Sequence, residues 1–458
     1  METSGIRRLA SEKTLFFLTA SIMILMPVSE LITQIWWNFD PLMQTSLYQP
    51  MVLGAYGFVG TVTVVIYKCL ELTDKTNRDK LYPVDVFYPL LILFMVLSAV
   101  FSVNPGMYCK GDIFMAETPM SFLAYFSLFF AGYRIRSHFY RKRLIVILLM
   151  IAVLQSVIAF FHTFDIEIAY SLPVRHSGAA YGLTQNSNFY GGLSVFLLAC
   201  VSGVFLFSEK FTKNRIIRYG IPVFAGFLFY TMMGSRARLV WTGFAAMIVF
   251  YVVSGAVMLK GNISRVDLKR YFMRLAALAA VFAAVFAITY FFTDYVSEEI
   301  YRTTMEVEGI YDSGIGSDRL LLWKCGLERV PYHWVTGIGL DNFREVFYEK
   351  YGNVEMPFYR DKAHNEYIQT LVNQGVFAFA LYLFIYLRTA VINVKKIFTG
   401  DDETERSLNW ILLGMFVTYD VQSFFNISVI NVALYFWLVM GLLNACDSPL
   451  RLPLNKNI

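Results

Sequence analysis

Apolar segments recur along the whole chain, each of roughly 17 to 25 residues and so long enough to cross a bilayer as a helix. This pattern predicts an all-α fold, a polytopic membrane helical bundle of about 12 transmembrane helices in a single integral-membrane domain, residues 1–458. We expect the first segment to be retained, because it is longer than the apolar region of a signal peptide and lacks a small-residue cleavage site. The predicted spans are 14–35, 51–70, 86–103, 117–134, 144–162, 188–207, 217–233, 239–258, 271–293, 367–388, 409–425 and 428–445.

Composition agrees with this pattern, and the charges orient it. Of the 458 residues, 57% are hydrophobic and only 16% are charged, against about 25% charged in soluble proteins. If the N-terminus is inside, the inside segments hold 27 of the 39 Lys and Arg residues. Cytoplasmic loops are rich in these residues, so we expect both termini in the cytoplasm. The net charge of +5 then reflects topology, and no basic surface is left for a nucleic-acid partner.

One long connection, residues 294–363, is expected on the outer side between the ninth and tenth spans. Within it, SDRLLLWKCGLERVP predicts a helix that Ser317 caps and Pro331 ends, with Leu320, Trp323 and Leu327 on one face. The stretch LDNFREVFYEKYG predicts a second amphipathic helix. Such helices either roof over an outer site or pack along the membrane interface.

A histidine stands at the start of the tenth span, in KAHNEYIQTLVNQGVFAFALYL. His364 follows the long loop directly, and Asn365 and Glu366 come next. A lone histidine at a helix start is either a cap or interfacial anchor, or a catalytic group whose near-neutral pKa suits proton transfer. Its role depends on what else lies at the outer face.

Two arginines lie in a tight outer turn, TMMGSRARLVW, between the seventh and eighth spans. Cations at this depth are costly unless they meet an anion or a cavity. The guanidinium fork matches phosphate oxygens, and free backbone N–H groups at the following helix start also favour anions. We expect Arg236 to be an anion ligand, and Arg238 to reach the interface or to join the substrate site.

The segment VRHSGAAYGLTQNSNFYGG leads into the sixth span and predicts irregular backbone at membrane depth. Its candidate substrate-binding residues are Arg175, Asn186 and Asn188; the asparagines either bind sugar or make turns.

Arg319, in the first loop helix, faces either a cavity or solvent. Asp420, inside the eleventh span, is either functional or a buried hydrogen-bonding partner. The stretches GIGS and GIGL are not nucleotide loops, because neither follows a strand.

With these residues assembled, the sequence resembles the O-antigen ligase and polymerase superfamily, bacterial membrane enzymes that handle polyprenyl-diphosphate-linked glycans. The resemblance covers residues 175–443, including the outer loop 294–363. Its matching pieces are GLTQNSN, with Ser187 where a proline is common, GSRAR, DRLLLWKCGLERVPYHWVTGIGLDNF, AHNEYIQTLVNQGVFAFALYL and the C-terminal SFFNISVINVALYFWLVMGLL.

The resemblance implies a helical bundle whose cavity opens on the outer side of the bacterial cytoplasmic membrane. It implies an inverting glycosyltransferase that needs no metal or other cofactor. Carried over by position, His364, Arg236 and Arg319 are the expected catalytic residues, and Arg238, Arg175, Asn186, Asn188 and Asn365 the expected substrate-binding residues. The implied partners are a polyprenyl-diphosphate-linked oligosaccharide, a glycan or lipid acceptor, membrane lipids and a regulator of chain length.

The chemistry of these side chains is compatible with that function. Displacing a diphosphate from an anomeric carbon builds negative charge, which Arg236 and Arg319 can stabilise. His364 either takes the proton of the attacking hydroxyl or orients the acceptor. A polymerase that joins repeat units is the first hypothesis, and a ligase that transfers finished glycan to a lipid or protein is the second. A transporter of lipid-linked oligosaccharide is a third hypothesis, although the sequence lacks the internal repeats common in carriers.

Overall fold

The computed structural model describes residues 11–37, 48–74, 80–106, 117–166, 178–184, 186–260, 265–307, 319–351, 362–399, 402–445 and 447–450. All regular elements in these residues are helices. They are α2 (Glu12–Trp37), α3 (Tyr48–Thr73), α4 (Pro83–Val100), α6 (Pro119–Arg134), α7 (His138–His162), α8 (Ser187–Leu206), η1 (Ser208–Lys210), α9 (Arg215–Gly234), α10 (Leu239–Lys260), α11 (Arg265–Phe292), α12 (Tyr295–Val307), α13 (Arg319–Arg329), η2 (Val330–Tyr332), α14 (Phe343–Tyr351), α15 (Glu366–Thr399), α16 (Glu403–Ser423) and α17 (Ile430–Leu443).

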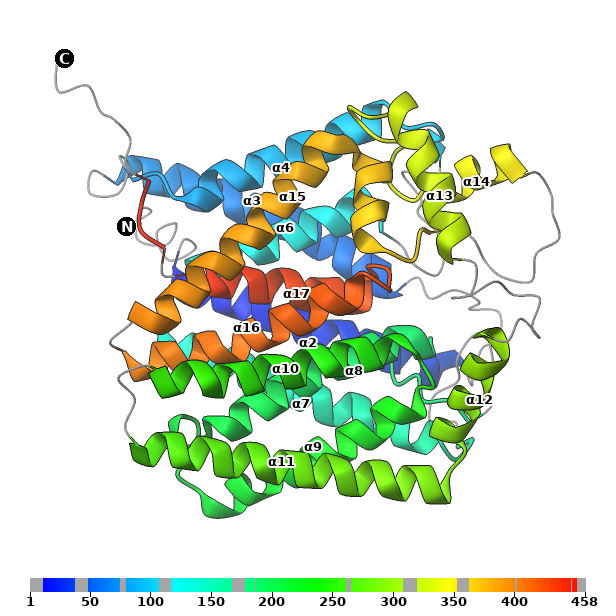
Figure 1. Cartoon of the computed structure of the whole chain (residues 1–458). Coiled ribbons are helices and arrows are strands. Elements are labelled where there is room, and N and C mark those ends of the chain that lie inside the picture. Colours follow the sequence, from blue (N-terminus) through cyan, green and yellow to red (C-terminus); the bar gives the residue numbers. More distant parts are fainter. Residues whose placement is uncertain are drawn as a thin grey trace.

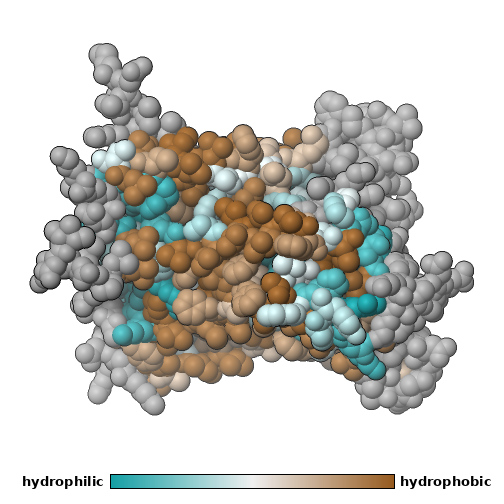
Figure 2. Space-filling model, turned by 90° about the horizontal axis from the view of Figure 1, so that it is seen from above, coloured by the Kyte–Doolittle hydropathy of each residue, from teal (hydrophilic) through white to brown (hydrophobic). Residues whose placement is uncertain are grey.

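Each of the 12 predicted spans coincides with one of these helices, so the predicted polytopic helical bundle is confirmed. Within the described ranges, 9 helices are long and apolar enough to cross a membrane: α2, α3, α4, α7, α8, α9, α10, α11 and α15. The shorter or more charged α6, α16 and α17 run among them (Figure 1). Apolar side chains form a broad belt across the middle of the molecule, with hydrophilic residues toward both ends (Figure 2).

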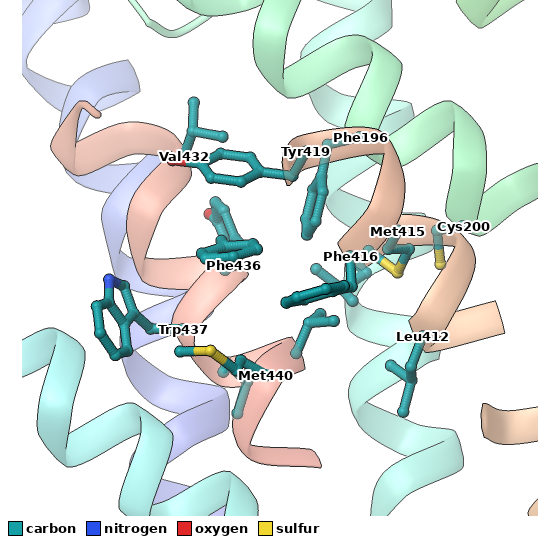
Figure 3. Packing of buried hydrophobic residues seen from close by; sticks show 14 of the residues in the cluster. Phe196, Cys200, Leu412, Met415, Phe416, Tyr419, Val432, Phe436, Trp437 and Met440 are labelled. Carbon is teal, nitrogen blue, oxygen red and sulfur yellow. The ribbon is translucent and has the colours of Figure 1, made fainter. Parts of the chain in front are cut away.

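The centre of the bundle is α8, whose apolar 18-residue stretch is completely buried. Phe196 of α8 meets Tyr419 of α16 edge to face, at 6.0 Å between ring centroids. Phe436 of α17 stacks on the same Tyr419 ring at 4.1 Å and on Phe416 at 5.6 Å (Figure 3). Aromatic pairs at these distances add to the burial of their apolar surface. The packing therefore fixes the C-terminal hairpin of α16 and α17 against the central helix.

Helices α6 and α17 approach closely through glycines. A Cβ at Gly441 would lie 2.3 Å from the Phe129 carbonyl oxygen, and one at Gly132 would lie 2.7 Å from the Leu438 carbonyl oxygen. In a bilayer, association depends on van der Waals contact between helices, and small residues let the backbones come together. These glycines let the later turns of α6 and α17 pack with their backbones in close contact.

The two ends of the bundle differ in charge. At one end, Arg134 pairs with Glu71 at 2.9 Å and with Asp85 at 2.6 Å. The first and last described segments meet this same end, because Glu12 accepts a hydrogen bond from the Ser137 N–H and Asp447 pairs with Arg388 at 2.7 Å. We call it the basic end. The loop helices α12, α13 and α14 lie at the opposite end, on the right in Figure 1.

The long loop forms the two predicted helices, α13 and α14, but it buries a different face of α13. Leu320 and Leu327 of the predicted apolar face are exposed, whereas Leu322, Cys325 and Gly326 are buried. The prediction was wrong because α13 packs on α14 and α15, whose position the local pattern does not encode. Helix α12 was not predicted, and the expected cap Ser317 lies outside the described residues.

Helix α15 is broken at Gly375, where φ is 83° and ψ is 175°. The loop that precedes α15 supplies new partners for the interrupted backbone. The Ile338 N–H donates to the Val372 carbonyl at 3.0 Å, and the Val376 N–H donates to the Trp334 carbonyl at 2.7 Å. Non-helical backbone at membrane depth requires such protein partners. The GIGL stretch is thus a backbone clamp on α15, which agrees with its rejection as a nucleotide loop.

We predict that Gly375→Ala destabilises the protein by at least about 1–3 kcal/mol, because this region of φ and ψ is open essentially only to glycine. An added Cβ would also lie 2.4 Å from the Val335 carbonyl oxygen. The thermal unfolding midpoint in detergent measures the effect. Gly220→Ala in α9 is the control, since its Cβ would meet nothing within 4 Å. Equal midpoints for the two variants would contradict the clamp.

Candidate active site

A buried lysine fixes the chain just before His364. Lys362 is 1% exposed, and its ammonium lies 2.6 Å from the Glu117 carboxylate and 3.6 Å from that of Asp341. It also donates to the Ser428 carbonyl at 3.2 Å. Burial disfavours the ammonium charge, but the carboxylates of Glu117 and Asp341 outweigh it and raise the pKa of Lys362 above its ordinary value. The lysine is therefore a charged anchor inside the protein.

The residues on both sides of His364 are held as firmly. The Ala363 N–H donates to Gln369 Oε1 at 2.7 Å, and its carbonyl accepts the Trp323 indole N–H at 2.9 Å. Asn365 Oδ1 caps α15 by accepting the N–H groups of Tyr367 at 3.0 Å and Ile368 at 3.1 Å. Asn365 thus has a structural role, while its buried Nδ2 has no acceptor among the described residues.

His364 itself has a left-handed backbone, with φ of 51°. Burial, followed by the positive charges of Arg319 and Lys362, lowers the pKa of its imidazole to about 4. The ring is therefore neutral at pH 7 and can accept a proton. Arg319, whose direction the sequence left open, is close enough to His364 to act on its charge.

Arg236 and Arg238 lie in the turn between α9 and α10, and both meet α12. Arg236 donates to Glu298 at 2.6 Å and to Asp294 at 3.2 Å. Arg238 is paired with Glu299. The Arg236 guanidinium also lies 5.1 Å from the ring centroid of Tyr295. Carboxylates thus occupy both arginine forks in this structure.

Left-handed backbone conformations occur both in the turn that carries Arg236 and in the group formed by His364, Lys362 and its partner Asp341. Of the four described non-glycine residues with positive φ, three are Arg236, Asp341 and His364, with φ of 54°, 54° and 51°. Each such residue costs on the order of 1–3 kcal/mol, and such strain gathers at active sites and ligand clamps. The strain supports a functional reading of both groups.

Two elements lie between the arginine turn and the His364 segment: the start of α8 and the connection between α16 and α17. A Cβ at Gly191 would touch Ala237 at 2.9 Å, so the first turns of α8 lie against the arginine turn. In the connection, the Ser428 N–H donates to Glu366 at 2.8 Å, beside the Lys362 anchor. On its other side, Asn431 Nδ2 donates to the Thr184 carbonyl at 3.5 Å, just before α8. The arginine turn and His364 are thus joined through intervening elements, rather than by a direct contact between Arg236 and His364.

The predicted asparagines lie at this junction. Asn186 caps α8 and accepts the Asn188 N–H at 2.8 Å, while the Asn188 side chain is exposed. Arg175 lies outside the described residues. Asp420 is half-buried and accepts the Tyr367 hydroxyl of α15 at 2.7 Å, a hydrogen bond to a neighbouring helix, which was one of the two roles that the sequence left open.

A small cavity lies behind the His364 segment, with about 10 Å³ open to water, which is room for about one water molecule. Its walls include the carboxylates of Glu117, Asp341 and Glu366. Sequence reasoning did not assign Lys362, Glu117 and Asp341 to the site. The sequence could have pointed to these three residues, because charged residues beside apolar spans usually have a partner or a function.

Part of the chain matches a known protein family. Residues 223–383 match the family model described as O-antigen ligase. The match begins in α9, ends in α15 and contains Arg236, Arg238, Arg319, His364 and Asn365. A comparison with curated proteins finds no match. The chain thus carries an O-antigen ligase domain, matched over residues 223–383.

Proposed function

We propose that the protein polymerises oligosaccharide repeat units of a surface polysaccharide, using a polyprenyl-diphosphate-linked donor at the outer face of the bacterial cytoplasmic membrane. The observation that carries the proposal is the anchored segment before α15, where bonds from Lys362 to Glu117 and from Trp323 to Ala363 hold His364 in a left-handed conformation. The positive charge of Arg319 acts on the imidazole there. A proton acceptor next to a fixed positive charge suits attack by a hydroxyl and departure of a diphosphate. The family match supports glycan transfer as the reaction class.

The charge distribution supports the outer face. Trp323 of α13 donates to the carbonyl of Ala363, so His364 lies at the α13 end of the bundle. In Figure 1 the helices α12, α13 and α14 lie together at this end, opposite the basic end. Lys- and Arg-rich ends of membrane proteins face the cytoplasm. Both termini are then cytoplasmic, and the site opens where exported lipid-linked glycans are handled.

The arginines are the proposed diphosphate ligands. The charge of Arg319 acts on His364, and Arg236 with Arg238 forms a second cationic group. Glu298 and Asp294 occupy Arg236 in the free protein, and a donor diphosphate would replace them with phosphate oxygens. Asp294 is 64% exposed and can move away without leaving a buried charge. Asn188 and the free amide donor of Asn365 are the proposed sugar contacts.

The reaction is one displacement at an anomeric carbon. The acceptor hydroxyl oxygen forms a bond to that carbon from the face opposite the diphosphate, which inverts the configuration. The bond to the diphosphate oxygen breaks, and the electron pair leaves with the polyprenyl diphosphate. His364 takes the hydroxyl proton, and the arginines balance the charge of the leaving group. These residues supply acid–base and electrostatic catalysis themselves, so the proposed mechanism assigns no step to a metal.

The second candidate is a ligase, and the description of the matching family as O-antigen ligase favours it. The chemical step is the same, and only the acceptor differs: a repeat unit for the polymerase, a lipid or protein for the ligase. A separate regulator of chain length is a partner only of the polymerase.

We predict that His364→Ala lowers the rate of glycan transfer by about 10²–10⁴-fold, the usual contribution of a positioned base. The measurement is transfer in membranes supplied with lipid-linked oligosaccharide. His333→Ala is the matched control, because it removes a histidine of the same loop that has no role in the site. Equal rates for wild type and His364→Ala, at equal expression, would remove the catalytic role.

The same His364→Ala cells distinguish the two candidates. Loss of a polymerase leaves single repeat units on the acceptor, whereas loss of a ligase leaves long chains on the carrier lipid. Gel separation of surface and lipid-linked glycan measures both. Long chains on the carrier lipid would replace the polymerase assignment with the ligase.

We predict an acid limb of kcat/KM near pH 4, because the base must be neutral and the pKa of His364 is lowered to about 4. Activity therefore persists as the pH falls below the ordinary histidine pKa and is lost only near pH 4. Arg319→Gln removes one of the lowering charges, so the limb moves to higher pH. Arg329→Gln on the same helix is the control and leaves the limb in place. A limb near the ordinary histidine pKa in the wild type would contradict this electrostatic arrangement.

A further inference from the structure

A second cavity lies at the basic end of the bundle, away from His364. Its volume is about 280 Å³, far above the space that one water molecule needs and near the lower end of ligand pockets, roughly 300–1,000 Å³. It is formed by the end of α8, by η1 and by the ends of α10, α11 and α16 that lie opposite the loop helices α12, α13 and α14 (Figure 1).

The floor of this cavity is apolar and its rim is charged. Leu206, Met258, Tyr271 and Trp410 line the floor, and each is almost completely buried. The rim carries four cations and three carboxylates, namely Lys210, Arg270, Arg274, Arg406, Glu209, Asp267 and Glu403. An apolar floor beneath a cationic rim fits a ligand that has both an apolar body and an anionic head.

The rim arginines are held in different ways. Arg274 is fixed, since it pairs with Glu209 at 2.8 Å and donates to the Leu206 carbonyl at 2.9 Å. Arg270 is 49% exposed, and its carboxylate partners are distant, Asp267 at 3.4 Å and Glu209 at 3.7 Å. The Arg270 fork can therefore turn to a phosphate with little loss, while Arg274 keeps the wall in place.

A buried donor in the cavity wall also lacks a partner. Trp410 is 4% exposed, yet its indole N–H has no acceptor in the part of the chain that the structure describes. A buried tryptophan N–H usually finds an acceptor. A ligand oxygen at this wall supplies one. This orphaned donor is independent of the charges on the rim.

We infer that this cavity binds the phosphate diester of an anionic phospholipid from the cytoplasmic leaflet, with the phosphate at Arg270 and the glycerol and acyl region over Trp410 and Met258. Basic pockets between membrane helices on the cytoplasmic side bind such head groups. The apolar floor and the position at the membrane border favour a lipid over a soluble phosphate. The site is separate from the proposed glycan transfer and does not depend on it.

The test is native mass spectrometry of the full-length protein in detergent, titrated with phosphatidylglycerol. Arg270→Gln should weaken retention of the lipid by at least about tenfold, the effect of losing one charge-assisted hydrogen bond. Lys269→Gln is the matched control, because Lys269 is an exposed neighbour on the same helix that does not line the cavity. Its retention should equal that of the wild type.

Two further arms examine the ligand class. Brominated phosphatidylglycerol should quench tryptophan fluorescence in the wild type and less in Trp410→Phe, whereas phosphatidylcholine carrying the same bromines should give no such difference. Inorganic phosphate should not raise the thermal midpoint. Equal retention by Arg270→Gln and wild type, equal quenching with both lipids, or protection by inorganic phosphate would each overturn the assignment.

Discussion

The buried ion pair between Lys362 and Glu117 is the interaction on which the candidate site depends. An ammonium that is 1% exposed is tolerated because two carboxylates and a carbonyl surround it. The pair joins the last residues of the loop 294–363 to Glu117, two residues before α6, and so ties the start of α15 to α6. His364, two positions after Lys362, has a left-handed backbone next to this anchor.

The membrane makes such anchors necessary. Polar groups in an apolar belt need partners within the protein, and the belt in Figure 2 leaves most charges to the two ends. The end that carries α12, α13 and α14 has irregular backbone at His364, Asp341 and Arg236, beside such ion pairs. The basic end uses its charges in ion pairs such as Arg134 with Glu71, and in the rim of the proposed lipid cavity. One bundle thus carries two chemically different polar sites.

Electrostatics in the candidate site follow from the same packing. Burial, followed by the positive charges of Arg319 and Lys362, lowers the pKa of His364 and keeps the imidazole neutral. Carboxylates on α12 occupy the forks of Arg236 and Arg238. A base that stays neutral and cations that can exchange carboxylate for phosphate oxygens are compatible with one reaction. Because α12 carries the carboxylates that pair with Arg236 and Arg238, movement of α12 is the change that most directly exposes the arginines.

The sequence by itself determined the helical spans, the basic end and the place of His364 at a helix start, because hydrophobic length and local charge are properties of contiguous residues. It did not determine which carboxylates meet Lys362, since Glu117 lies 245 positions away and only packing brings it near. For the same reason, the tertiary structure decided three further features: the buried face of α13, the break at Gly375 and the pairing of Arg236 with α12. Each of these depends on a neighbour that is remote in sequence.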